Sequence, residues 1–339
     1  MWSYTYNGRR SAFGDAQRIF FSAASNDSGK RALATALERG TRSIYIGAPD
    51  DAPQLAKVKK AIRDVVATTI LRRDELSIVC ECSHLWNPTA LRTKVVDLLA
   101  KLDVAYLDGL LLPASLLPPF ETQLCVDELE HGWRQLVEMR NEGLVKRIGV
   151  SDFPVVFLEV LFDRFPTDRV EIICLSVHPL QPQRHVIRFA HAKQLDVLAR
   201  CPTALPDTVA YADRERWLQL AASIAVSHAS LTFKYTLPSE TVQADTAVAV
   251  LSPPVDASVP MLPLKTPSQV AVKWLLQRGL VCVPMVEGDE PYSDENVADL
   301  FSLTHPFVHD VASAAPSKPY QFILSKDEMV AIGHLGAPH

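Results

Sequence analysis

The apolar and polar positions repeat one unit along the chain, which consists of an amphipathic helix, a glycine and a short apolar strand. The clearest copy spans residues 133–153. Leu136 and Met139 mark the apolar face of its helix, and Gly143 supplies the positive φ that a helix C-cap favours. The apolar run 148–150 predicts a buried strand, so this stretch predicts one helix-to-strand step of a parallel sheet.

Strand and helix patterns alternate eight times. Near-continuous apolar strands that alternate with helices are typical of a parallel sheet covered by helices. Eight such units predict an α/β fold of the closed (β/α)8 TIM barrel type, and 339 residues fit one barrel with insertions. An open doubly wound sheet is the alternative, but no glycine-rich phosphate loop follows an early strand. We expect strands at 18–21, 43–47, 76–80, 106–112, 148–150, 172–177, 195–199 and 280–283, and helices at 28–38, 52–68, 91–102, from 127, 155–165, 186–192, 267–278 and 325–335.

One segment, residues 203–265, departs from this alternation. It contains a helical pattern near 217–227 and then a run rich in Pro, Ser, Ala and Val. A connection this long is uncommon inside a compact domain, and after a seventh strand it lies at the C-terminal face of a barrel. A lid or contact surface and a plain surface loop are both open. We expect a single barrel domain over 1–339, with an insertion at about 203–265 and a C-terminal tail from about 305.

Composition excludes several classes of protein. A net charge of −5 and a pI of about 6.1 make a nucleic-acid partner unexpected. No run of about 18 apolar residues occurs, so no membrane span is expected. The six cysteines lie mostly in apolar, strand-like runs, which is typical of reduced, buried thiols. The N-terminus is faintly similar to a transit peptide, but no apolar segment follows it, so we expect no secretory signal and a cytoplasmic or other reducing intracellular location.

Several motifs occur in order along the chain. They are AYLDGLLL at 105–112, GLVKRIGVSDF at 143–153, HPLQPQ at 178–183, PSQVAVKWLLQRGLVCVP at 267–284 and the pair Glu295-Asn296. Together they resemble the aldo-keto reductase family, and the resemblance covers roughly residues 33–296. It implies a (β/α)8 barrel, NADPH as cofactor, and hydride transfer to a carbonyl assisted by an Asp-Tyr-Lys-His tetrad.

The chemistry explains why the family needs these four residue types. A hydride delivered to the carbonyl carbon leaves an alkoxide that must be protonated. A tyrosine does this well only if a nearby lysine lowers its pKa and an aspartate holds that lysine. A histidine completes the site by donating a hydrogen bond to the carbonyl oxygen.

By this resemblance, the four tetrad positions hold other residue types here. Tyr45 stands in the place of the aspartate, and Asp50 in the place of the tyrosine. Pro113, which has no N–H to donate, stands in the place of the histidine. The lysine position has two registers: counting along the strand gives Glu81, and matching the Leu-Trp-Asn motif that follows gives His84.

None of these residues replaces the missing charges in an obvious way. Without a lysine beside it, Tyr45 should be a poor acid at neutral pH. Simpler roles are a side chain that fills the barrel for Tyr45, a partner of a basic residue for Glu81, and a surface loop residue for His84. A rearranged acid–base pair of Tyr45 and Asp50 is the open alternative. We therefore expect a degenerate tetrad with no catalytic residue, and no metal site.

The cofactor positions implied by the resemblance are also changed. Met285 and Val286 replace a Lys-Ser pair for the 2′-phosphate, and Tyr292 replaces an arginine. Two apolar side chains give a phosphate nothing to pair with. Arg200 stands where a tyrosine stacks on the nicotinamide, and Cys174 where the family has glutamine.

Four positions come closest to the family pattern. Ser151 and Asp152 match its Ser-Asn pair for the carboxamide, and Glu295 and Asn296 match its Glu-Asn pair near the adenine. They form a vestigial cofactor site, so we expect no bound cofactor, with weak NADPH binding as the alternative. The preferred interpretation is a catalytically inactive structural or interaction subunit with protein partners in a larger complex. The alternative is a residual NAD(P)H-dependent oxidoreductase or a nucleotide-binding sensor.

Overall fold

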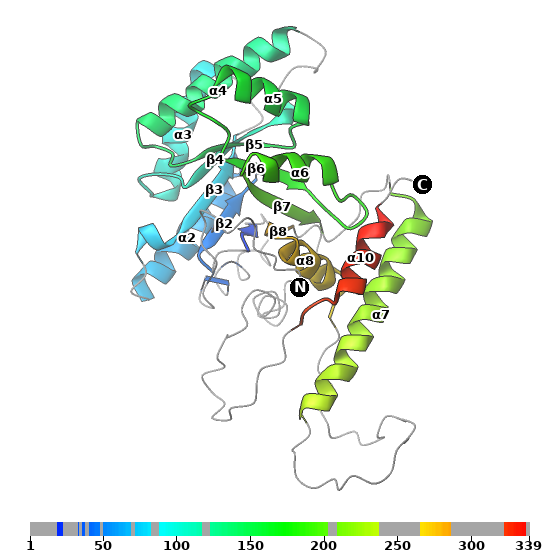
Figure 1. The fold of residues 1–339 in the computed structure, drawn as a ribbon. Coiled ribbons are helices and arrows are strands. Elements are labelled where there is room, and N and C mark those ends of the chain that lie inside the picture. The colour runs from blue at the N-terminus through cyan, green and yellow to red at the C-terminus, as the bar shows by residue number, and fades with distance from the viewer. Residues whose placement is uncertain are drawn as a thin grey trace, which may run out of the picture.

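The computed structural model describes residues 19–22, 33, 36–37, 41–47, 50–68, 72–82, 88–116, 123–202, 209–236, 265–285 and 322–336. Within them, eight strands form one parallel sheet in the order β1 to β8 (Figure 1). A parallel bridge between Ile19 and Cys282 joins the first strand to the last, and Phe20 N donates to Cys282 O over 2.9 Å. The strands are β1 Phe21–Ser22, β2 Ser43–Ile46, β3 Ser77–Glu81, β4 Gly109–Pro113, β5 Ile148–Ser151, β6 Ile172–Ser176, β7 Asp196–Pro202 and β8 Val281–Met285.

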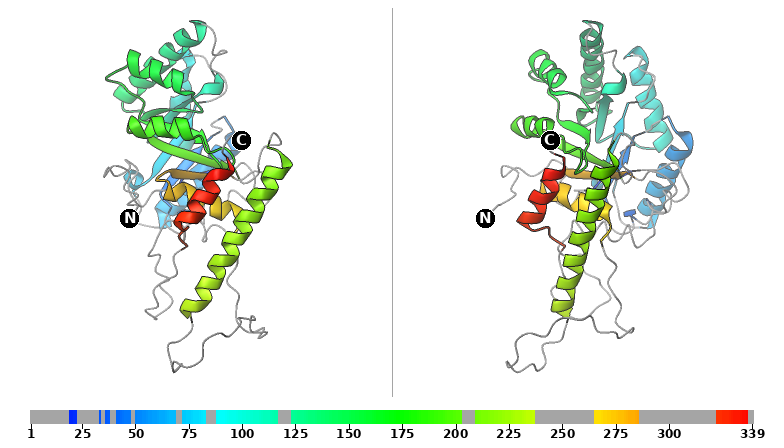
Figure 2. Two further views of the ribbon diagram at one scale, coloured as in Figure 1. Left: turned by 45° about the vertical axis from the view of Figure 1, so that its right-hand side comes forward. Right: turned by 90° about the vertical axis from the view of Figure 1, so that its right-hand side faces the viewer.

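Helices alternate with the strands and cover the outside of the barrel (Figures 1 and 2). The predicted (β/α)8 barrel is therefore confirmed, and the open doubly wound sheet is wrong, because β1 and β8 meet. The described helices are α2 Ala52–Thr68, α3 Pro88–Leu102, α4 Gln123–Asn141, α5 Val155–Arg164, α6 Arg184–Ala192, α7 Tyr211–Thr236, α8 Pro267–Gln277 and α10 Lys326–Leu335, with short 3₁₀ turns η1 Arg73–Glu75 and η2 Ala114–Leu116.

Capping boxes mark the starts of α8 and α10, whereas the start of α4 was not predicted correctly. The helix α8 begins with the expected capping box, in which Thr266 and Gln269 bond each other's backbone N–H. The prediction that α4 starts at Asp127 is wrong, because the helix already begins at Gln123. Glu130 does not cap it and instead pairs with Arg134 at 2.8 Å. Most of the helix expected at 28–38 lies outside the described residues.

Strand side chains divide into two apolar cores. Outward-facing residues pack under the helices, as Ile78 and Cys80 do on β3. The inward-facing residues form a separate cluster that fills the barrel. This interior cluster contains Phe20, Tyr45, Val79, Leu111, Ile172, Cys174, Leu198, Val281 and Val283. Because side chains alternate along a strand, the next inward position after Val79 is Glu81, and the next after Leu198 is Arg200.

Gly149 leaves room for the neighbouring strand inside the barrel. It is an inward-facing position of β5 and pairs in register with Ile172 of β6. A Cβ atom on Gly149 would lie 2.3 Å from Ile172 O and 2.8 Å from Leu111 Cδ2. Since the first of these is a backbone atom, it cannot move aside without distorting the sheet.

The segment after β7 contributes a helix of 26 residues, α7, which is longer than the expected helix at 217–227. It packs beside α10 and α8 (Figure 2). Trp217 on its buried face meets the ring of His178, with centroids 5.3 Å apart and planes at 83°. This contact connects α7 to the loop after β6.

The C-terminal segment is held to α8 by paired hydrogen bonds. Gln277 Nε2 donates to Leu324 O over 2.9 Å, and Leu324 N donates back to Gln277 Oε1 over 2.8 Å. The expected helix at 325–335 is confirmed as α10, with a capping box at Ser325 and Glu328. Among the described helices, none combines the length and the hydrophobicity that are needed to cross a bilayer.

We predict that Gly149→Ala destabilises the barrel by about 1–3 kcal/mol, because the added methyl group overpacks a rigid backbone contact. Gly333→Ala is the matched control, since a Cβ atom at that position of α10 meets nothing within 4 Å. The control should stabilise by about 0.5–1 kcal/mol through helix propensity. Urea unfolding of both variants measures the difference, and equal effects would contradict this account of Gly149.

His178 should make stability depend on pH. Burial lowers its pKa to about 4, and its Nδ1 accepts from Leu180 N at 3.2 Å. The pKa of His178 in the folded state lies below the unfolded value of about 6.5. Protonation of this residue therefore leaves the free energy of unfolding unchanged above pH 6.5 and lowers it as the pH falls toward 4. Between pH 7 and pH 5 this amounts to roughly 2 kcal/mol. His178→Asn keeps an acceptor and should lack this loss in urea unfolding, whereas the exposed control His185→Asn should retain it.

Candidate functional site

A cluster of polar side chains lies at the C-terminal mouth of the barrel, next to its apolar filling. At its centre, Glu81 Oε1 accepts three hydrogen bonds. Tyr45 Oη donates over 2.5 Å, Ser151 Oγ over 2.6 Å and Arg200 Nη1 over 3.2 Å. Tyr45 and Ser151 are buried, and the side chain of Glu81 is 9% exposed. One carboxylate oxygen therefore gathers donors from three other strands.

The barrel geometry explains why these residues meet. Glu81, Ser151 and Arg200 each occupy an inward position near the C-terminal end of their strand. Parallel strands bring these ends to one face of the barrel, where active sites of this fold lie. Tyr45 lies one layer deeper, inside the interior cluster, and its hydroxyl group reaches up to the carboxylate.

Arg200 connects this centre to the rim. Its Nη2 atom is ion-paired with Asp152 Oδ2, and Asp152 Oδ1 accepts from Ser176 N at 3.1 Å. Asp152 takes a left-handed backbone conformation, with φ of 55°. Arg200 Nε is buried and has no hydrogen-bond partner among the described residues. Buried donors are normally satisfied, so this atom is an exception that needs an explanation.

Burial and neighbouring charges determine the protonation states of Tyr45, Cys174 and Arg200. Burial, together with Cys174 and Glu81, raises the pKa of Tyr45 well above 10, so the phenol stays protonated. Burial also raises the pKa of the Cys174 thiol to about 12, and this thiol lies 3.9 Å from Tyr45 Oη. Although burial acts to lower the pKa of Arg200, the acidic groups around it outweigh that effect and raise it. The cluster thus contains a permanent cation and a neutral phenol.

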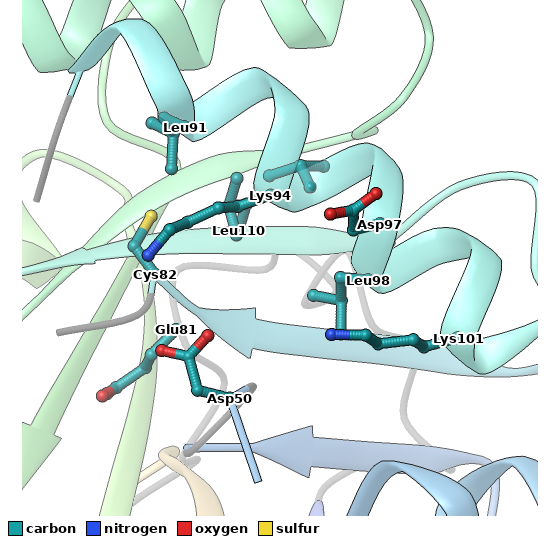
Figure 3. A pocket seen from close by; sticks show the side chains of 10 residues that line it. Asp50, Glu81, Cys82, Leu91, Lys94, Asp97, Leu98, Lys101 and Leu110 are labelled. Carbon is teal, nitrogen blue, oxygen red and sulfur yellow. The ribbon is translucent and has the colours of Figure 1, made fainter. Parts of the chain in front are cut away.

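A small cavity lies between the end of β3 and α3, and Asp50, Glu81 and Cys82 line it together with residues of α3 (Figure 3). Its volume of about 60 Å³ has room for a few water molecules. Asp50, which is exposed, turns its carboxylate toward the end of β3, and Lys94 extends from α3 toward the same end beside Cys82 (Figure 3). An ammonium group therefore lies next to the mouth, on a helix rather than on a strand.

The structure brings some of the proposed positions together and leaves others apart. Tyr45 and Glu81 are hydrogen-bonded to each other, and Pro113 lies buried at the end of β4, in register with Ser151. Asp50 is not hydrogen-bonded to Glu81, but both residues line the same small cavity. His84, Val286, Tyr292, Glu295 and Asn296 lie outside the described residues. Within the described part of the chain, no group of three His, Cys, Asp or Glu residues could hold a metal ion.

Sequence reasoning did not place Arg200 or Lys94 near the mouth of the barrel. Arg200 was interpreted only as the loss of an aromatic residue, although its inward position two residues after Leu198 placed a cation in the mouth. Lys94 belongs to the polar face of an amphipathic helix, where a lysine carries no special pattern. Only the packing of α3 against β3 brings it to this edge.

Comparison with known proteins gives consistent results. A family model described as "Aldo/keto reductase family" matches residues 13–248. Methylglyoxal reductase DkgA of Escherichia coli K12 is 30% identical over 169 residues, which are 48% of this chain and 54% of that protein. Deoxymugineic acid synthase 1-D of Triticum aestivum is 30% identical over 193 residues, 53% of this chain and 59% of that protein. The chain thus spans little more than half the length of these relatives.

Solved structures share the fold. The aldose reductase of Schistosoma japonicum superimposes with a TM-score of 0.62 and 19% identity, covering 93% of this chain and 87% of that one. An aldo/keto reductase from Brucella melitensis gives a TM-score of 0.61 and 19% identity, with 94% of each chain covered. At this identity the likeness concerns the fold.

Two expectations are overturned by these matches. The sequence relatives are named as a reductase and a synthase, so the expected catalytically inactive structural or interaction subunit is wrong. The expectation of no cofactor is wrong as well, because the matched family is NAD(P)H-dependent. Both expectations rested on the residue types at single positions. The hydrogen-bonding groups that they form together were not considered.

We predict strong coupling between Glu81 and Arg200 in stability. Removing one member of a buried ion pair costs about 3–5 kcal/mol, because the other charge stays buried without its partner. Arg200→Met and Glu81→Gln should therefore each destabilise the fold, and the double variant should lose clearly less than their sum.

Urea unfolding of the four proteins gives the coupling energy. The exposed pair Arg92 and Glu142, 2.8 Å apart, serves as the control, and its variants should change stability little. Additive losses at Glu81 and Arg200 would contradict this account of the mouth.

Proposed function

This chain belongs to the aldo/keto reductase family, and we propose that it is an NAD(P)H-dependent oxidoreductase that reduces the carbonyl group of a small compound. A reductase among its sequence relatives supports this reaction class. The observation that carries the proposal is the unpartnered Arg200 Nε atom, buried at the mouth near Ser151 and Asp152.

The donors and acceptors of the mouth fit a nicotinamide carboxamide. This group needs a donor for its oxygen atom and acceptors for its NH₂ group. Arg200 Nε supplies a donor. The Ser151 hydroxyl group already donates its hydrogen bond to Glu81, so its oxygen is left as an acceptor. The carboxylate of Asp152 can only accept hydrogen bonds. When bound, the cofactor supplies the hydride, and these three side chains hold and orient its carboxamide.

The adenine end of the cofactor is proposed from the sequence. Glu295 and Asn296 match the family's pair at this end, and we assign them as contacts. Met285, at the end of β8, is half-buried and cannot pair with a 2′-phosphate. We therefore propose that NADH binds at least as well as NADPH.

The tetrad positions in this proposal are Tyr45, Asp50, Glu81 and Pro113. Tyr45 donates a hydrogen bond to Glu81, and its raised pKa makes the phenol a weak acid. Pro113 offers no donor to a carbonyl oxygen. Turnover is accordingly expected to be slower than in enzymes that have the complete tetrad. A nucleotide-binding protein without turnover is the second candidate, favoured by the same hydrogen bond between Tyr45 and Glu81.

We further propose that residues 1–339 form a single domain. In it, about 203–265, including α7, are an insertion after β7, and the residues from about 305 form a C-terminal tail. Because β7 ends at the mouth, the insertion begins beside the proposed cofactor.

Cofactor binding is tested by calorimetric titration with NADH and NADPH. Arg200→Met should weaken binding by about 10- to 100-fold, as expected for losing a hydrogen bond from a charged donor. Arg200→Lys keeps the charge but lacks Nε, and should be weakened as well. Arg216→Met removes an exposed arginine of α7 and is the matched control. Failure of both cofactors to bind the wild type at millimolar concentration would overturn the proposal.

The two candidate functions are then separated by a turnover assay. Oxidation of the bound cofactor is followed at 340 nm with methylglyoxal or 4-nitrobenzaldehyde as substrate. Slow turnover that is lost in Arg200→Met supports the oxidoreductase. Saturable cofactor binding without any turnover would instead favour the nucleotide-binding protein.

A further inference from the structure

A second groove lies at the opposite end of the barrel from the mouth. It is formed where α4, α5 and α6 return to the N-terminal ends of β5, β6 and β7. Its volume of about 740 Å³ lies in the range of small-molecule sites. Phe162, Val170 and Leu195 give it apolar walls, and Thr167 lies at its edge. The groove shares no lining residue with the mouth.

The groove is rich in basic side chains. Three of its cations belong to the packed structure, because they are paired with carboxylates. Arg140 pairs with Glu171 at 3.4 Å and also with Asp168. Arg147 pairs with Asp196 at 2.6 Å and with Glu171 at 3.4 Å. The third, Lys146, pairs with Asp108 at 3.3 Å.

The remaining two cations, Arg169 and Lys193, have no such partner. Neither forms an ion pair with another residue in the described part of the chain, and both are exposed. Lys193 Nζ lies 5.1 Å from the ring centroid of Phe162, on the groove wall. The carboxylates along the groove are already bonded to Arg140 and Arg147, so Arg169 and Lys193 leave it with excess positive charge on an otherwise acidic protein.

We propose that this groove binds a small phosphate monoester. Such a dianion can bridge Arg169 and Lys193, and an arginine pairs with phosphate oxygens through two parallel hydrogen bonds. The apolar wall at Phe162 accommodates the organic part of the ligand. A nucleic acid is disfavoured, because the chain has a net charge of −5. The proposal does not depend on the reductase function.

The proposal is tested by calorimetric titration with phenyl phosphate at pH 8, at constant ionic strength. The double variant Arg169→Gln, Lys193→Gln should bind at least tenfold more weakly than wild type. The double variant Lys60→Gln, Arg188→Gln removes the same charge from exposed sites on α2 and α6. This control should bind as wild type does.

Two further measurements distinguish the groove from the mouth. Saturating NADH should not displace phenyl phosphate from the wild type. Its affinity should fall below about pH 6, where the ester becomes a monoanion.

Several results would overturn the proposal. They are absence of binding to the wild type at 10 mM, an equal loss in the control variant, and competition with NADH.

Discussion

The alternation of inward and outward side chains along eight parallel strands is the constraint on which this structure depends. Every second residue of a strand must either fill the barrel or line its mouth. In the middle of the barrel this requirement selects apolar residues, with glycine at 149, where the next backbone comes too close for a side chain. At the C-terminal ends the same positions hold Glu81, Ser151 and Arg200. The polar centre is thus a direct continuation of the packed core.

The mouth is organised around the carboxylate of Glu81. Glu81 accepts the hydrogen bond of the Tyr45 phenol, and the cation beside this carboxylate comes from β7 as Arg200. Burial, together with Cys174 and Glu81, raises the pKa of Tyr45, so the phenol keeps its proton. The same carboxylate accepts the hydrogen bond of the Ser151 hydroxyl group, which leaves the Ser151 oxygen as an acceptor. It also binds Nη1 of the Arg200 guanidinium group. The carboxylate therefore holds a phenol, a hydroxyl and a guanidinium group in fixed positions around one oxygen atom.

The two ends of the barrel carry different kinds of charge. At the mouth, one cation is shared by Glu81 and Asp152, and its remaining donor faces no partner in the described structure. At the other end, a ladder of ion pairs across the starts of β5, β6 and β7 ties neighbouring strands together, and Arg169 and Lys193 remain outside it. Both ends combine a structural network with an excess donor. The groups that point to a ligand are Arg200 Nε at the mouth and the cations Arg169 and Lys193 at the other end.

The sequence by itself determined the barrel. Apolar strands, the glycine stop at 143 and the capping box at Thr266 act through contacts between residues close in sequence, so the order and approximate bounds of the elements were predictable. The start of α4 was missed because Asp127 and Glu130 were interpreted as its capping pair, although the helix already begins at Gln123. The candidate positions in the mouth could be named, but not their relationships. Glu81 and Arg200 are 119 residues apart, and only closure of the barrel brings them within hydrogen-bonding distance. Pairing across strands and the packing of α3 beside β3 decided which charges meet, because Coulombic and hydrogen-bond energies depend on distances that the order of residues does not contain.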